Sequence, residues 1–216
     1  MKSKIHKNLL ELNNKAMRKS LKINSLKKAI NISLIVILFT SACAQSGKDS
    51  NTAMTNNTAT KTAVSQPKID IHSAVISGNL EAVKQHIEAG TNINEKDAMS
   101  GSTPLISAAT FNKPEIAKAL IDANADLSLK NNDGGTALHS ASFFGRIEIV
   151  QLLIDANADK SIRNNFGATP RETVMADFDD MKPIYEMLQQ QLKPFGFELD
   201  MNELEKARPV ISMMLQ

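Results

Sequence analysis

Apolar residues recur at helical spacing from residue 69 onward, whereas residues 44–68 contain almost no large apolar side chain. The spacing is clearest within residues 136–155, where apolar residues at this spacing include Leu138, Ala141, Ile147, Val150, Leu153 and Ile154. Steps of three and four residues place side chains on one face of a helix. Gly145 interrupts this pattern, and glycine tolerates the left-handed turn that joins two short helices. The pattern therefore predicts an all-α fold built from pairs of short helices.

The same sequence returns after 33 residues. Residues 103–108 (Thr-Pro-Leu-Ile-Ser-Ala) return as residues 136–141 (Thr-Ala-Leu-His-Ser-Ala), and the motif begins again at Thr169. A second marker, residues 121–126, returns as residues 154–159. A fixed period of this length indicates a stacked repeat array rather than a single globular core. The predicted units are 69–102, 103–135, 136–168 and a fourth that begins at Thr169.

The N-terminal region has the organisation of an export signal. Residues 30–39 are mostly apolar, a stretch too short to cross a bilayer comfortably, and two lysines precede them. Small residues then lead to Cys43, the only cysteine of the chain. We therefore predict a signal peptide at residues 1–42, with Met17 as a second candidate for the translation start. A membrane anchor that is never cleaved is the alternative.

The residues before Cys43 resemble the lipobox of bacterial lipoproteins, in which the signal is cut before the cysteine and the cysteine receives lipid. The resemblance implies that acyl chains on Cys43 hold the protein at a membrane. Residues 43–68 would then be the lipidated cysteine and a flexible tether, because so polar a stretch cannot bury enough surface to become ordered. Ala44 resembles the sorting choice of outer-membrane lipoproteins, which implies a cell-envelope location on the outer membrane, facing the periplasm.

The charge of the chain is concentrated at its N-terminus. Residues 1–29 carry a net charge of +8, whereas the whole chain carries +2, so the remainder is −6. A nucleic-acid-binding domain needs a basic patch on the fold itself, so this distribution argues against a nucleic-acid partner. A single cysteine also excludes an intramolecular disulfide and a cysteine-based metal cluster.

The repeated motifs resemble the ankyrin repeat. Residues 136–141 match the Thr-Pro-Leu-His-x-Ala start of that repeat, residues 145–154 match its second helix, and Ala158 and Asp159 match the loop that follows. The resemblance implies an ankyrin-repeat solenoid of about four helix-turn-helix units.

The chain is therefore predicted to have four parts: the signal peptide at 1–42, the lipidated cysteine and linker at 43–68, the ankyrin repeat domain at 69–193, and a C-terminal extension at 194–216. The extension fits no repeat unit. Residues 203–208 favour a short helix, which we expect to end at Pro209.

No arrangement of residues in the sequence indicates catalysis, a cofactor or a metal site, and we expect a protein that is not an enzyme and takes no small-molecule substrate. In the ankyrin family the histidine of the unit start is structural, and its ring bonds to the threonine of its own unit and to a neighbouring loop. The resemblance implies this role for His72 and His139. His86 falls on a second helix and is expected at the surface. Asp177 and its acidic neighbours are better explained as a solvated turn or a helix cap than as a cation site.

The resemblance also implies where a partner protein would bind. Ankyrin partners meet the hairpin tips and the exposed side of the first helices, and the residues at these positions are Met99, Phe111, Asn132, Asp133, Phe143, Phe144, Asn165 and Phe166. Exposed aromatic clusters are typical of interface anchors. The alternative is that some rings fill gaps between stacked units, because Phe111 and Phe144 share one repeat position.

These features together predict a membrane-tethered ankyrin-repeat lipoprotein that binds an unknown protein partner in the bacterial cell envelope. Two alternatives stay open within this class: an immunity protein that neutralises a toxin, and an accessory protein that assists a neighbouring enzyme. An enzymatic role and a purely structural role in the envelope are the remaining hypotheses.

Overall fold

The computed structural model describes residues 68–216, so the predicted signal peptide, Cys43 and nearly all of the predicted linker lie outside the described residues. The described part of the chain is helical, without strands. Its elements are α2 (Ile71–Ser77), α3 (Leu80–Glu88), α4 (Pro104–Thr110), α5 (Pro114–Asp122), α6 (Ala137–Phe143), α7 (Ile147–Asp155), α8 (Pro170–Thr173), α9 (Phe178–Leu192), the 3₁₀-helix η1 (Lys193–Phe195) and α10 (Met201–Met214). None of these helices is long and apolar enough to cross a membrane.

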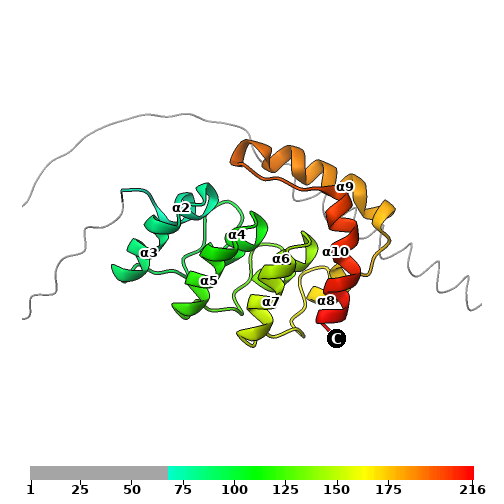
Figure 1. Ribbon diagram of the computed structural model, residues 1–216, viewed down its shortest axis with the longest axis horizontal. Helices are drawn as coiled ribbons and strands as arrows, with labels where there is room; N and C mark the ends of the chain where they lie inside the picture. Colours follow the sequence, from blue (N-terminus) through cyan, green and yellow to red (C-terminus); the bar gives the residue numbers. More distant parts are fainter. Residues whose placement is uncertain (1–67) are drawn as a thin grey trace, which may run out of the picture. The chain divides into compact units, whose positions relative to one another are not determined.

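The helices α2–α7 form three antiparallel pairs that stack side by side (Figure 1). The first helices of the pairs, α2, α4 and α6, form one row, and the second helices, α3, α5 and α7, form a second row beneath it. The fourth unit consists only of the single turn α8, which packs on α6. The all-α repeat solenoid predicted from the sequence is thus confirmed.

Small residues let the stacked helices approach closely. Ala74, Ala108 and Ala141 occupy one repeat position in the first helices, and each is fully buried. The second helices contribute larger side chains to the same core, including Leu120 and Leu153. Each unit therefore buries its apolar face only against its neighbours, which is the basis of stability in a repeat array.

Threonines at the unit starts cap the first helices. Thr103 Oγ1 accepts a hydrogen bond from the backbone N–H of Ile106 (3.3 Å). Thr169 forms a reciprocal cap, because its Oγ1 accepts from the N–H of Glu172 (3.3 Å) and the Glu172 carboxylate accepts from the N–H of Thr169 (2.9 Å). Caps of this kind satisfy backbone donors that a helix leaves free at its N-terminus. Asp177 caps α9 in the same way, as predicted.

Two ladders of hydrogen bonds join the loops of successive units. In the first, the Asn132 side chain donates to Met99 O (3.1 Å), and the Asn165 side chain donates to Asn132 O (2.9 Å). In the second, Lys96 Nζ donates to the carbonyl of Lys130 (2.6 Å), and Lys130 Nζ donates to that of Arg163 (3.0 Å). The sequence period of 33 residues therefore reappears as equivalent contacts between equivalent atoms.

The prediction that Pro209 ends a helix was wrong, because α10 continues to Met214. A proline inside a helix removes the N–H that would bond to the carbonyl four residues earlier, here that of Glu205. Both Pro209 and Glu205 are exposed, so water can satisfy the free carbonyl. The proline is tolerated on the outer side of the helix.

The prediction that His86 is a surface residue was also wrong. Its side chain is 7% exposed, and its ring contacts Ile69 O through Nε2 (2.8 Å) and Thr91 Oγ1 through Nδ1 (3.1 Å). His86 occupies the repeat position of Leu120 and Leu153. In all three units the backbone carbonyl of this residue accepts a hydrogen bond from the N–H five residues later, just after the second helix ends. The position belongs to the core, and the ring also fixes the chain just before α2.

His72 does not make the contacts that the family resemblance implied. Both of its ring nitrogens are buried without a hydrogen-bond partner among the described residues. Ile69, which has no hydroxyl, stands where the other units have threonine, and the cap of α2 moves to Asp70. Asp70 bonds to the backbone and hydroxyl of Ser73 (3.0 and 2.6 Å). His72 therefore lacks the threonine partner that its counterpart has.

Candidate partner-binding surface

The predicted partner-binding residues fall into two groups in the structure. The first is the tip row, formed by the loop residues Met99, Asn132, Asp133, Asn165 and Phe166. All five are exposed, and Met99 is 74% exposed. Because the asparagine ladder joins one tip to the next, the tips form a continuous edge rather than independent loops. Met99 and Phe166 lie at its two ends and give it an apolar side chain at each.

The second group is the aromatic row, Phe111, Phe143 and Phe144, at the C-terminal ends of α4 and α6. Phe144 is only 8% exposed, and the other two are half-buried. The Phe143 and Phe144 rings meet edge to face with centroids 5.0 Å apart. The row is thus covered, and the residues that cover it come from the C-terminal part of the chain.

Tyr185 and Phe197 cover the aromatic row. The Tyr185 ring lies 4.7 Å from that of Phe143, centroid to centroid. Phe197 lies 5.1 Å from Phe144 and 5.9 Å from Phe111, in both cases edge to face. These separations are those of favourable aromatic pairs. The sequence contained a signal for this contact, because Phe197 and Leu199 alternate with charged residues as in a half-buried extended segment.

Two arginines hold the covering segment, and sequence reasoning identified neither. Arg146 lies over the Phe197 ring at 5.5 Å and donates from Nη2 to the carbonyl of Glu198 (2.9 Å). Burial lowers the pKa of Arg146 to about 10, so the guanidinium is still charged at neutral pH. Arg208 is buried and donates to the Tyr185 hydroxyl (2.7 Å) and to the carbonyl of Ala176. Burial raises the pKa of Tyr185, which keeps the phenol neutral.

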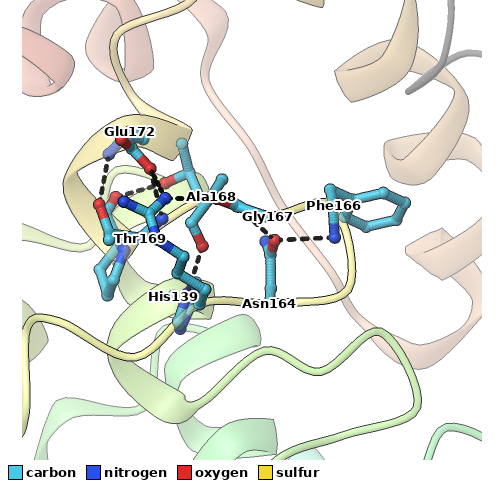
Figure 2. A network of polar contacts seen from close by, with 10 residues as sticks. His139, Asn164, Phe166, Gly167, Ala168, Thr169 and Glu172 are labelled. Atoms are coloured by element: carbon cyan, nitrogen blue, oxygen red, sulfur yellow. Dashed lines mark hydrogen bonds and ion pairs between the residues drawn. The ribbon is translucent and has the colours of Figure 1, made fainter. Parts of the chain in front are cut away.

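His139 lies in a separate polar network beside the loop that carries Phe166 (Figure 2). Its Nδ1 accepts from the backbone N–H of Thr136 (3.2 Å), and its Nε2 lies 3.0 Å from the carbonyl oxygen of Ala168, the last residue before the next unit. A carbonyl can only accept, so Nε2 carries the proton. Asn164 shapes the same loop by accepting from the N–H groups of Phe166 and Ala168 (both 3.0 Å). The structural role that the resemblance implied for His139 agrees with these contacts.

The described residues contain no group of three or more potential metal-ligating side chains. The Phe166 ring points away from the polar network in Figure 2. This arrangement therefore fixes the position of an exposed aromatic side chain, and its polar groups satisfy one another.

We expect His139→Ala to lower the free energy of unfolding by about 1–3 kcal/mol, because the half-buried carbonyl of Ala168 and the buried N–H of Thr136 would each lose a partner. Burial lowers the pKa of His139, so the folded state favours the neutral ring. An unperturbed histidine titrates near about pH 6.5. The unfolded chain thus binds the proton more readily than the folded chain does. The stabilisation that the neutral His139 ring provides is therefore complete above the ordinary histidine pKa and decreases as the pH falls below it.

Urea unfolding at about pH 7.5 and about pH 5.5, on either side of the ordinary histidine pKa, measures this effect. The wild type should be less stable at the lower pH, and His139→Gln should show a smaller difference. An equal pH difference in the variant would assign the effect to another group.

Comparison with known proteins agrees with this geometry. Residues 71–164 match the family model for ankyrin repeats, in three copies. The chain is similar to protein phosphatase 1 regulatory subunit 27 of Homo sapiens, with 44% identity over 64 residues. These residues cover 30% of this chain and 41% of that protein, and the Mus musculus protein of the same name matches to the same extent. Ankyrin repeat-containing protein P1E11.10 of Schizosaccharomyces pombe is 45% identical over 65 residues, 30% of each chain. The match thus spans less than half the length of each relative. The chain therefore contains three ankyrin repeats, which account for its stacked helix pairs.

Proposed function

We propose that this chain is a protein-binding lipoprotein of the bacterial cell envelope, in which the ankyrin array holds a partner protein and a lipid on Cys43 holds the array at a membrane. The observation that supports binding most directly is the tip row, a continuous exposed edge fixed by hydrogen bonds between units. An edge that is already ordered loses little conformational freedom when it binds, so more of the contact energy contributes to affinity.

The tip row combines the features of a binding edge. Met99 and Phe166 provide exposed apolar surface at its ends, and the asparagine and aspartate residues between them provide polar atoms. An aromatic anchor surrounded by polar groups is the common composition of a protein interface. Phe166 is the residue that we expect to contribute most to affinity.

Membrane attachment rests on the sequence alone. The apolar stretch at residues 30–39 and the small residues before Cys43 support a lipoprotein signal, and Ala44 supports sorting to the outer membrane with the repeats in the periplasm. Lipidation with two or more acyl chains would make the attachment stable.

An accessory or immunity role is the second candidate. Two of the similar proteins are named as regulatory subunits of a protein phosphatase. Their similarity supports, for this chain, the general role of binding an enzyme or toxin and changing its activity. Co-purification of a hydrolytic enzyme or a toxin would favour this candidate over a structural partner of the envelope.

Replacing Cys43 with serine should abolish incorporation of labelled fatty acid and leave an uncleaved precursor, because the thiol is the acceptor of the lipid. Metabolic labelling followed by immunoprecipitation, with membrane fractionation alongside, measures both effects. Labelling that persists in Cys43→Ser would show that the chain is not a lipoprotein of this type.

Affinity capture from detergent-solubilised envelopes tests the binding function. We expect Phe166→Ala to reduce recovery of the partner, since truncation of an interface anchor commonly costs about 2 kcal/mol, or roughly thirtyfold in affinity. Met175→Ala is the matched control, because Met175 is an exposed apolar residue outside the tip row. If Phe166→Ala is folded and recovers the partner as well as Met175→Ala does, the tip row is not the binding edge.

A further inference from the structure

The segment from α9 to residue 200 covers the first-helix side of the array, and we name residues 178–200 the flap. The flap consists of α9, η1 and an extended stretch that returns to α10, and Figure 1 shows α9 running past the row of first helices. Its ring contacts with the repeats are those of Tyr185 with Phe143 and of Phe197 with Phe111 and Phe144. The flap therefore covers the row of residues that the family resemblance assigns to a partner.

The repeats provide a complete site for the Phe197 ring. Phe111 and Phe144 present their rings to it edge to face, and the Arg146 guanidinium lies over it at 5.5 Å. Phe197 is 2% exposed as a result. Aromatic walls together with a cation are a favourable environment for an aromatic side chain.

The same site also recognises a backbone. Arg146 Nη2 donates to the carbonyl of Glu198 (2.9 Å), so one side chain contacts both the ring and the peptide unit that follows it. Phe197 and Leu199 are buried whereas Glu198 and Asp200 are exposed, which is the alternation of an extended chain. The contact thus has the form of peptide recognition, in which the backbone is held and alternate side chains are inserted.

The flap differs from α10 in how it is attached. Ala207 and Ile211 of α10, and Leu215 just after it, belong to the core that runs through the repeats, whereas the buried residues of the flap, Tyr185 and Phe197 among them, do not. Helix α10 packs on α7 and α8 and closes the array. The flap lies between α8 and α10, and the hydrogen bond from Arg208 of α10 to the Tyr185 hydroxyl (2.7 Å) joins it to that helix.

We propose that the aromatic row is a binding site for an extended segment of a partner protein that carries an aromatic side chain, and that the flap fills this site as an intramolecular competitor. The proposal rests on the proposed protein-binding function and adds a partner class and a form of regulation to it. The partner's ring replaces that of Phe197 between Phe111 and Phe144, and its backbone carbonyl takes the hydrogen bond of Arg146. Binding in this site is weakened by the fraction of molecules in which the flap is closed.

A labelled peptide with the sequence of residues 193–200, Lys-Pro-Phe-Gly-Phe-Glu-Leu-Asp, tests the site directly. Fluorescence anisotropy is measured with the full chain in detergent, as wild type and as Phe197→Ala. We expect Phe197→Ala to bind the peptide at least about tenfold more tightly than the wild type, because its own ring no longer occupies the pocket. A peptide with alanine at its fifth residue should bind neither protein, and adding Arg146→Met to Phe197→Ala should weaken binding.

Equal affinity of the wild type and a folded Phe197→Ala, or no binding to either, would overturn the proposal. Circular dichroism of Phe197→Ala shows whether the repeats remain folded. The assay needs neither the lipid nor the cellular partner, so a failure here is distinguishable from a failure of the Cys43 or Phe166 experiments.

Hydrogen exchange of the unmodified wild type provides a measurement that does not depend on any variant. The amides of Tyr185 to Leu192 and of residues 197–199 should exchange at least about tenfold faster than those of α5 and α7, because the proposal requires the flap, which lies outside the core shared by the repeats, to open locally before global unfolding. The amides of α10 should be protected as well as those of α7. Equal protection of the flap and α7 would show that the flap is a fixed part of the fold and would also overturn the proposal.

Discussion

Replacing Gly134 with alanine should lower the free energy of unfolding by about 2–4 kcal/mol, since two costs add at this residue. Its φ angle of +72° is unfavourable for any residue with a Cβ. A Cβ there would also lie 2.4 Å from Asn165 Oδ1 and 2.7 Å from Asn165 N. The tip of the next unit would have to move away, and the hydrogen bonds that Asn165 donates to Asp133 O and Asn132 O would weaken.

Gly167 is the matched control for this prediction. It occupies the same repeat position, with a φ of +76°, but no atom lies within 4 Å of a Cβ added to it. Gly167→Ala should therefore show only the conformational cost, about 1–2 kcal/mol. Chemical denaturation of both variants measures the difference. If Gly134→Ala and Gly167→Ala lose the same stability, the hydrogen bonds between successive tips contribute nothing to the stacking of the repeats.

The parts of the fold that could be predicted from the sequence are those set by local contacts. The unit boundaries followed from the period, because each unit repeats the same cap, turn and apolar positions at the same spacing. The role of His139 followed from the family resemblance, and the contacts with Thr136 and Ala168 agree with it. In these cases the residues that decide the structure are close in sequence or lie one period apart.

His86 shows how a single inserted residue can hide a core position. Unit one, residues 69–102, is one residue longer than the two units that follow, and the extra residue lies between Ile93 and Thr103, so that His86 corresponds to Leu120 and Leu153. The spacing indicates a core position, whereas the residue type, a polar histidine on a second helix, favours the surface. The ring fits because its two nitrogens find Ile69 O and Thr91 Oγ1 at the edge of the first unit.

The environment of the aromatic row could not be predicted from the repeat pattern. Phe111 and Phe144 share one repeat position, which is compatible with a core role and with a partner role. The residue that distinguishes the two, Phe197, comes from a segment that follows the last unit and has no counterpart in the period. The placement of such a segment depends on long-range packing, here the contacts of Phe197 with Arg146 and the two rings. The assignment of both rings as partner contacts stays a prediction, which the peptide experiment addresses.

Ile211→Ala should be among the most destabilising single substitutions in the C-terminal region, with a loss of about 2–5 kcal/mol. Ile211 is fully buried and belongs to the core shared with the repeats. Helix α10 approaches the array so closely that a Cβ on Gly145 would lie 2.8 Å from Leu204 Cδ1. A cavity at Ile211 therefore forms where the last unit is closed, in a place that cannot easily collapse.

Val210 is the matched control, because it precedes Ile211 in the same helix and is exposed. Val210→Ala should change stability by less than about 0.5 kcal/mol, as is usual for a surface position. Thermal melting gives the size of the effect, and hydrogen exchange gives its extent. In a repeat array each unit depends on its neighbours, so Ile211→Ala should reduce protection in α6 and α7 as well as in α10. A loss of protection that spreads through α7 would make α10 the terminal cap of the solenoid. If the loss is confined to α10, or if the two variants have the same melting temperature, the array ends at α8 and α10 does not contribute to the stability of the repeats.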